Sequence, residues 1–386
     1  MLEMPLAHGL GGRSDLPVPL WLAIWAGAAA VLVSFVAMSL LWTTSRLRGA
    51  DAGRALPGFV QTLVRGPATA VVVRVLAAVA VLTLVAVAWF GPDSSAENPA
   101  PTWFYVWFWV GGAALAALTG IAVDGRRGTW FATAGLAAFL WLELAFPYSD
   151  SPRVVAVFVA VYAIVRPGGF AEYFRLFARL APFGIRSDGR AVVRNPLDGL
   201  LTGRAVPLPI VLLVLGATTF DGLSRLPLWT DTTGDLSELA ATAANTAGLA
   251  GTVALVALGY AGAVWLTKPY LRRDAGDPHQ AFAHSLIPVT LGYTVAHYFS
   301  FFVFQGQAGI TLLLDNARID YGVVGTTTIA VVQIGAIVAG HVMGVISAHD
   351  RAVAVLRPGY VKVGQFPMLA LMVVYTMVGI QLVASA

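Results

Sequence analysis

Residues 281–307, AFAHSLIPVTLGYTVAHYFSFFVFQGQ, form an apolar stretch that is long enough to cross a membrane, because about 20 helical residues span the hydrocarbon. The stretch nevertheless carries two histidines, two glutamines and Pro288. Polar groups inside lipid need partners, so a segment of this kind is expected to face the interior of a helix bundle. It therefore predicts a polytopic membrane protein with a polar interior.

The composition of the whole chain supports this prediction. Of its 386 residues 58% are hydrophobic and 11% are charged, whereas soluble domains carry about 25% charged residues. The absence of cysteine excludes disulfides, Fe–S clusters and thiolate nucleophiles. The basic residues fall between the apolar runs. The expected partner is therefore the lipid bilayer of the cell (inner or plasma) membrane, and no nucleic acid is expected.

Apolar runs recur along the chain and predict an all-α bundle of about ten spans, of which the fifth is the shortest. The predicted spans are 19–42, 68–90, 102–123, 129–147, 153–167, 206–221, 243–267, 281–305, 323–347 and 365–385. Arginine and lysine concentrate in alternate loops, which predicts that both termini lie outside. The N-terminus lacks a signal-peptide pattern, so the first span is expected to be an uncleaved anchor.

A basic segment in the middle divides the chain into an N-terminal half (1–167), a cytoplasmic connector (168–205) and a C-terminal half (206–386). EYFRLFARLAPF, residues 172–183, predicts either an amphipathic helix on the inner membrane surface or a charged connecting helix. Each half opens with a Pro-x-Pro step, at 16–22 and at 206–212. Two halves of five spans each would form an inverted repeat, a plan typical of secondary transporters.

Four histidines are predicted on the cytoplasmic side of the membrane: His279, His284, His341 and His349. Pro288 removes the N–H that would pair with the carbonyl of His284, which predicts a kink. Gly340 and Gly344 allow the ninth span to pack closely against the eighth. Imidazoles at one depth are candidate ligands for a transition metal or a haem, although no HExxH motif is present. The alternative is a kink whose polar groups are satisfied by neighbouring helices.

A second polar group is predicted nearer the outer side. Glu143, Asp221 and His297 lie at comparable heights, with Tyr293 one turn below His297 and Gln305 at the outer end of the eighth span. Ionisable groups inside a membrane commonly mark ion paths, proton paths or binding sites. Hydrogen-bonded packing between helices is the competing interpretation.

Four stretches together resemble a family of bacterial membrane proteins known as fenitrothion hydrolase, a membrane component. They are HGLGGRSDLPVPLWL (8–22), VSFVAMSLLW (33–42), HSLIPVTLGYTVAHYFS (284–300) and GHVMGVISAHDRA (340–352). The resemblance implies cleavage of a P–O bond in a lipophilic phosphotriester. His284, His297, His341, His349 and Asp350 lie within these stretches, and the resemblance assigns no catalytic role to any of them.

Three hypotheses remain open from the sequence. The first is a membrane enzyme, or a subunit of one with a partner membrane subunit, that binds a metal or haem on the eighth and ninth spans. The second is a secondary transporter of a lipophilic small molecule or ion, with Glu143, Asp221 and His297 as coupling groups. The third is a non-catalytic membrane scaffold, in which protein groups satisfy every buried histidine.

Overall fold

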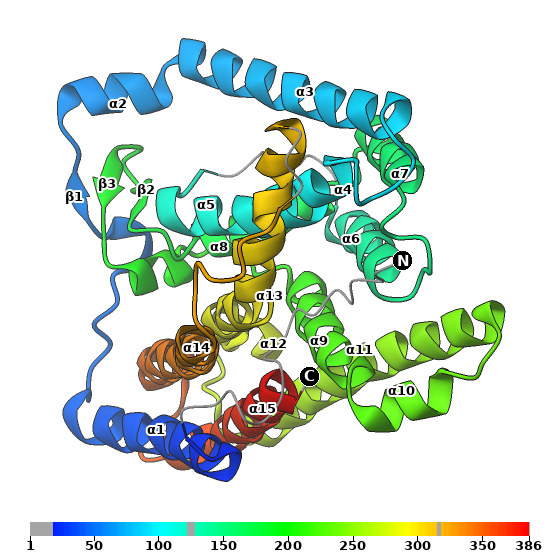
Figure 1. The fold of residues 1–386 in the computed structure, drawn as a ribbon. Coiled ribbons are helices and arrows are strands. Elements are labelled where there is room, and N and C mark those ends of the chain that lie inside the picture. Colours follow the sequence, from blue (N-terminus) through cyan, green and yellow to red (C-terminus); the bar gives the residue numbers. More distant parts are fainter. Residues whose placement is uncertain (1–17, 122–127, 315–317, 386) are drawn as a thin grey trace.

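A computed structural model describes residues 18–121, 128–314 and 318–385, and the chain folds there into a helical bundle with one small sheet (Figure 1). The helices of the first half are α1 (Leu20–Leu41), α2 (Gly58–Arg65), α3 (Pro67–Phe90), α4 (Ala100–Thr102), the π-helix η3 (Trp103–Gly111), α5 (Gly112–Thr119), α6 (Thr129–Leu144), α7 (Pro152–Val165) and α8 (Gly169–Ala178). Those of the second half are α9 (Leu208–Ser224), α10 (Pro227–Thr233), α11 (Glu238–Thr267), α12 (Pro278–Ala281), α13 (Leu286–Thr311), α14 (Thr326–Val355) and α15 (Phe366–Ser385). Short 3-10 helices are η2 (Gly49–Asp51), η4 (Pro196–Leu201), η5 (Lys268–Tyr270), η6 (Ala283–Ser285), η7 (Leu312–Leu314) and η8 (Val363–Gln365).

The predicted bundle of apolar helices is confirmed, and by length and composition the described residues support fewer than the ten spans predicted. Among the described residues, seven helices are long and apolar enough to cross a membrane. The number rises to nine if two bent pairs, α7 with α8 and α9 with α10, are each counted as one span. Helix α6, with 16 residues, falls below the length required of a span.

The predicted close packing of the eighth and ninth spans is confirmed by α13 and α14, which make the most extensive helix contact in the bundle. A Cβ atom built on Gly340 would lie 2.6 Å from the carbonyl oxygen of Pro288 and 3.2 Å from the Cα atom of Gly292. A Cβ atom built on Gly344 would likewise lie 2.8 Å from the carbonyl oxygen of Ser285. Both glycines are needed for the two backbones to come this close.

The predicted kink inside the eighth span is wrong. Pro288 is the third residue of α13, where a backbone N–H has no helical partner to lose. His284 lies before this helix, in the separate 3-10 turn η6. The proline therefore lies in the first turn of α13, where it costs the helix no hydrogen bond.

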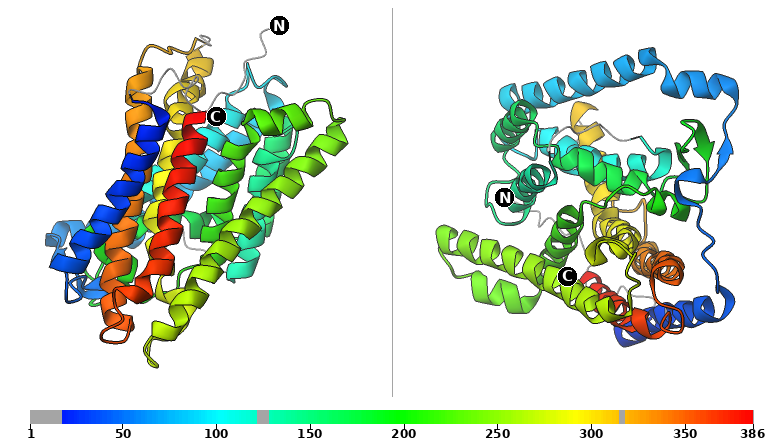
Figure 2. Two further views of the ribbon diagram at one scale, coloured as in Figure 1. Left: turned by 90° about the horizontal axis from the view of Figure 1, so that it is seen from below. Right: turned by 180° about the vertical axis from the view of Figure 1, so that it is seen from behind.

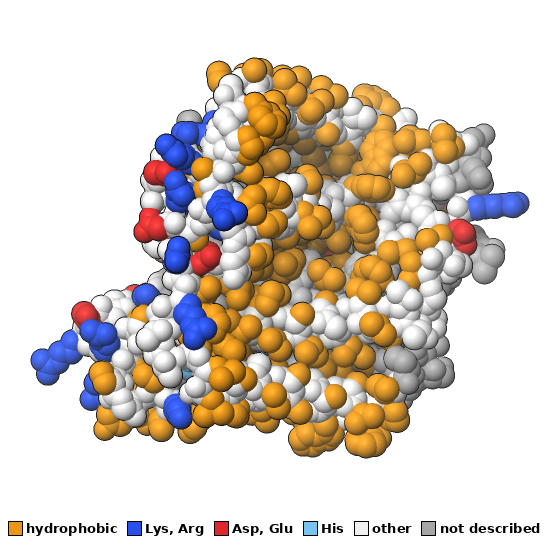
Figure 3. All heavy atoms as spheres, turned by 90° about the vertical axis from the view of Figure 1, so that its left-hand side faces the viewer, with side chains coloured by type: hydrophobic (Ala, Val, Ile, Leu, Met, Phe, Trp, Pro, Cys, Tyr) orange, Lys and Arg blue, Asp and Glu red, His pale blue; other side chains and the backbone are white. Residues whose placement is uncertain are grey.

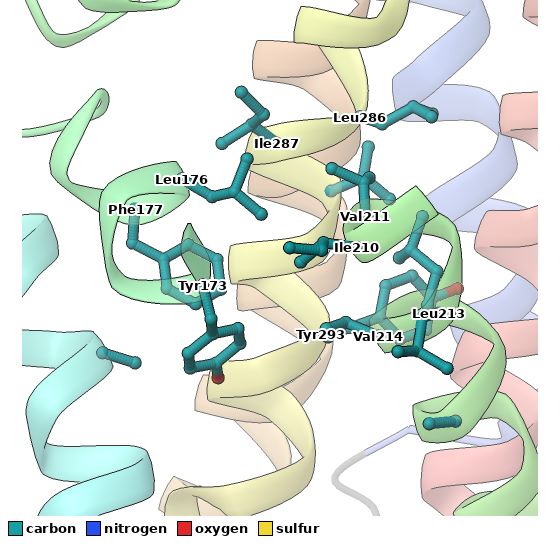
Figure 4. Close-up of a cluster of buried hydrophobic side chains, with 14 of the residues drawn as sticks. Tyr173, Leu176, Phe177, Ile210, Val211, Leu213, Val214, Leu286, Ile287 and Tyr293 are labelled. Carbon is teal, nitrogen blue, oxygen red and sulfur yellow. The ribbon is translucent and has the colours of Figure 1, made fainter. Parts of the chain in front are cut away.

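The connector differs from a helix lying on the membrane surface. Its helix, α8, buries its apolar side chains against α5, α6 and α9, so bundle residues cover the face expected to contact lipid. Figure 4 shows Tyr173, Leu176 and Phe177 of α8 grouped with Ile210 of α9 and Ile287 of α13. The rest of the connector adds strands to an antiparallel sheet of order β1-β3-β2, formed by β1 (Arg54–Ala55), β2 (Phe183–Ile185) and β3 (Ala191–Val193).

The packing of neighbouring helices differs between the two halves. In the second half, α9 packs on α11, α13 on α14, and α14 on α15. In the first half, α1 packs on α14 and α15 of the other half, and α3 packs mainly on α7 (Figure 2). Within the described residues this arrangement gives the inverted repeat no support.

Candidate functional site

The four inner histidines have separate environments. The Nε2 atom of His284 is hydrogen-bonded to the Ser347 carbonyl at 3.2 Å. The Nδ1 atom of His341 pairs with the Ile337 carbonyl of its own helix at 2.9 Å, and its buried Nε2 atom has no partner. His279 is exposed at the start of α12.

His349 is buried near the C-terminal end of α14, and both of its ring nitrogens contact oxygen atoms. These are the Trp42 carbonyl, at 3.0 Å, and Oε1 of Gln365, at 3.1 Å. Among the residues that the structure describes, no group of three or more histidine, cysteine, aspartate or glutamate side chains is arranged to hold a metal ion. The predicted set of His279, His284, His341 and His349 is therefore not brought together as one ligand group.

Asp350, the neighbour of His349, anchors the segment after α1 to α14. Its carboxylate is fully buried and accepts four hydrogen bonds. Trp42 Nε1 donates at 2.9 Å, the Ser45 hydroxyl at 2.8 Å, and the main-chain N–H groups of Arg46 and Leu47 at 2.6 and 3.3 Å. A carboxylate satisfied in this way fixes a loop, and both of its oxygens are already hydrogen-bonded to protein.

The outer polar residues form a connected cluster, which is the candidate site. Asp221 near the end of α9 is 4% exposed and His297 in α13 is 5% exposed. His297 Nε2 contacts one carboxylate oxygen of Asp221. The Arg225 guanidinium donates to the other oxygen, at 2.7 Å from Nη2 and 3.1 Å from Nε. The residues predicted at equal height, Asp221 and His297, are therefore in direct contact.

Glu143 at the end of α6 is the second carboxylate of the cluster. Its Oε1 accepts a hydrogen bond from the Tyr298 hydroxyl at 3.3 Å, and its Oε2 is buried without a partner. It is close enough to Asp221 and Arg225 to interact with both electrostatically. The cluster thus joins α6 of the first half to α9 and α13 of the second.

Two further polar atoms near Tyr298 lack partners. The Nε1 atom of Trp109, in the π-helix η3, approaches Tyr298, and the Tyr173 hydroxyl approaches Thr294. Neither contact has hydrogen-bond geometry, so both atoms are buried without a partner. The Trp109 and Tyr173 rings stack with their centroids 3.8 Å apart. π-helical segments are rare and are frequently found at functional sites.

Two residues predicted in the outer group lie elsewhere. The Tyr293 hydroxyl donates to the Tyr375 carbonyl, and its ring packs edge-on against His341. Gln305 is partly buried about two turns beyond His297 along α13. Tyr293 therefore belongs to the α13–α14–α15 contact, and the cluster consists of Glu143, Asp221, Arg225, His297 and Tyr298.

Arg225 and Tyr298 were not predicted from the sequence as site residues. Arg225 stands in the predicted outer loop, but its spacing of four residues from Asp221 is the signal for an ion pair on one helical face. Tyr298 directly follows His297 and carries no such signal, because its contact with Glu143 depends on how α6 and α13 pack.

The charges of the cluster do not balance when His297 is neutral and both carboxyl groups are ionised. Two carboxylates then face one guanidinium in a largely buried place. An uncompensated charge is costly in a low-dielectric interior, so binding of one proton or one cation restores neutrality. The arrangement of the cluster therefore suits the binding of one proton or one cation.

No protein-family model, curated protein or solved structure matches the chain. The interpretation of the site therefore depends on its geometry and chemistry.

Proposed function

We propose that the protein is a ten-pass cell-membrane transporter, and that it couples proton binding at the Glu143–Asp221–His297 cluster to the movement of a lipophilic small molecule or ion. One observation carries the proposal: Asp221 is in contact with a histidine and an arginine within the bundle, and Glu143, which interacts electrostatically with Asp221 and Arg225, has one buried carboxylate oxygen without a partner. Ionisable groups are expensive inside a membrane, and proton relays of pumps and transporters commonly contain them.

The proposed topology counts α6 and α7 as full spans and places both termini outside. The alternation of basic loops in the sequence supports it. The first residues of α1 and the last residues of α15 also lie at the same end of the bundle (Figure 2). Helix α6, short for a span, ends at the cluster, where the polar side chains of α9 and α13 surround it.

A break in the helix beside the cluster supports a transport role. Helix α9 ends at Ser224, directly before Arg225, and the chain then bends by 75° into α10. Interrupted helices next to ionisable groups are typical of the ion and substrate sites of secondary transporters.

The proposal is tested by proton flux into proteoliposomes that contain a trapped pH-sensitive dye, driven by a potassium diffusion potential. We expect the purified protein to admit protons faster than protein-free vesicles do. Asp221→Asn and Glu143→Gln should abolish the difference, and the exposed outer-side Asp235→Asn serves as the matched control. Flux equal to that of empty vesicles, or flux that survives both substitutions, would reject the proposal.

The other two hypotheses are weaker on this geometry. A hydrolase that binds a metal ion through several side chains needs a ligand set, and the inner histidines of the described chain are not arranged as one. The scaffold hypothesis accounts for His284, His349 and Asp350, which are hydrogen-bonded to protein. It does not account for the unpartnered oxygen of Glu143.

A further inference from the structure

Helix α3 stands apart from the bundle over its first half. Every residue from Val71 to Ala80 is exposed, including Val75 at 55% and Leu76 at 63%. Only Leu84 and Ala88, further along the helix, are buried, and they lie in the part that packs on α7 and α4. The helix is thus attached at its outer end and free of the bundle at its inner end.

The space between this arm and the bundle is a hollow with apolar walls. Figure 3 shows it in the hydrophobic flank, below the arm formed by α2 and α3, which lies at the top as in Figure 1. Helix α5 exposes Leu115 (55%) and Leu118 (67%), and α3 makes no extensive contact with α5 or α13 in the described chain. Within a bilayer, such a space must be filled by apolar matter.

One charged residue of α3 faces this hollow. Helical periodicity places Arg74 two turns before Val81, on the same face as Val81 and Ala88, which turn towards the protein. Arg74 lies roughly 10 Å along the helix from Pro67 at 1.5 Å per residue, within the candidate span Pro67–Phe90. It makes no ion pair with any residue in the described ranges, and 67–90 contains no acidic residue.

The rim of the hollow is also basic. Arg65 ends the amphipathic helix α2, which buries no residue and exposes Phe59 at 76% and Leu63 at 65%. This apolar face is suited to the membrane interface. Asp188, the acidic residue of the adjacent β2–β3 hairpin, is already paired with Arg186 at 2.6 Å. Figure 3 shows Lys and Arg side chains gathered at one edge of the apolar flank.

We infer that the hollow between α3 and the bundle binds one anionic phospholipid of the inner leaflet. Its acyl chains fill the space beside Ala78 of α3 and Leu115 of α5, and its phosphate accepts hydrogen bonds from Arg74 and Arg65. A second copy of α3 is a poorer occupant, because it would bring a second Arg74 and no acidic group. The inference does not depend on the proposed transport function.

The test is retention of lipid by the full chain in native mass spectrometry, after delipidation and titration with phosphatidylglycerol or phosphatidylcholine. We expect wild type to prefer phosphatidylglycerol. Arg74→Gln should weaken that binding about fivefold, and Arg65→Gln combined with it about 25-fold, as expected for loss of one basic contact each. Arg74→Lys should retain most of the preference. Arg273→Gln, an exposed cytoplasmic-side change elsewhere, is the matched control.

Two results would overturn the inference. One is equal binding of the two lipids by wild type, or a preference that Arg74→Gln leaves intact. The other is a dimer in which the hollow is filled by protein. The chain has no cysteine, so Val75→Cys introduces a single thiol, and efficient disulfide cross-linking between two such chains in membranes would identify a second copy as the occupant.

Discussion

Replacement of Asp350 by alanine should release the segment that follows α1. Asp350 is 0% exposed and holds this segment through four hydrogen bonds, three to Oδ1 and one to Oδ2. A hydrogen bond to a charged group contributes about 1.5–3 kcal/mol. The donors are only partly buried, so water would replace some of the bonds. The expected cost for the loop is therefore about 3–5 kcal/mol, similar to loss of one partner from a buried charged network.

The conservative substitution separates hydrogen bonding from charge. Asp350→Asn keeps an oxygen in the position of Oδ1, which accepts from Trp42, Arg46 and Leu47, and it loses the acceptor for Ser45. Its expected cost is about 1–2 kcal/mol. Asp274→Ala is a suitable control, since this side chain is 75% exposed, and it should change stability by less than about 0.5 kcal/mol.

Amide hydrogen exchange at Arg46 and Leu47 tests this prediction directly, because both N–H groups donate to Asp350. Each 1.36 kcal/mol corresponds to a factor of ten, so Asp350→Ala should speed their exchange by about a hundredfold or more. Asp350→Asn should give an intermediate increase. Exchange in Asp350→Ala equal to that in wild type would show that the loop is held by other contacts, and would refute the structural role assigned to this carboxylate.

Two further predictions concern packing and pH. Gly340→Val should strongly lower the thermal midpoint of unfolding in detergent, because the valine side chain would collide with the Pro288 carbonyl at a cost of about 1–3 kcal/mol or more. Gly335→Val on the same helix should not, because no atom lies within 4 Å of a Cβ built there. Equal midpoints for the two variants would contradict the α13–α14 contact. The hydrogen bond from Arg186 lowers the pKa of Asp188 from 3.8 to about 2. Because the folded-state pKa is the lower one, this stabilisation is present above pH 3.8 and is lost as the pH falls through about 2. Amide exchange in the β2–β3 hairpin should therefore accelerate as the pH falls over that interval. In Arg186→Gln the acceleration should occur over a higher pH interval.

The sequence predicted the features that depend on local pattern. The membrane helices follow from apolar length, and the α13–α14 contact follows from Gly340 and Gly344. Asp221 and His297, which are in contact, were predicted to lie at comparable depths in the membrane. The direction of a helix and the number of residues along it are enough to predict such a depth.

Features that depend on long-range packing were not predictable. Strand β1 pairs with β3 across more than a hundred residues, and neither strand has a distinctive pattern. His284 and His341 were expected to meet, but the 3-10 turn before Pro288 brings His284 to Ser347, nearly two turns beyond His341 on α14. Likewise, Tyr298 becomes a site residue only through the packing of α6 against its neighbours.

In the proposed function, the cluster of Glu143, Asp221 and His297 binds an exchangeable proton within the membrane. Infrared difference spectroscopy of the protein in lipid, between acidic and alkaline buffer, measures this most directly. We predict a protonated-carboxyl C=O band at acidic pH that is lost at alkaline pH and is absent from Glu143→Gln. A spectrum without that band, or a band unchanged in both Glu143→Gln and Asp221→Asn, would contradict the claim.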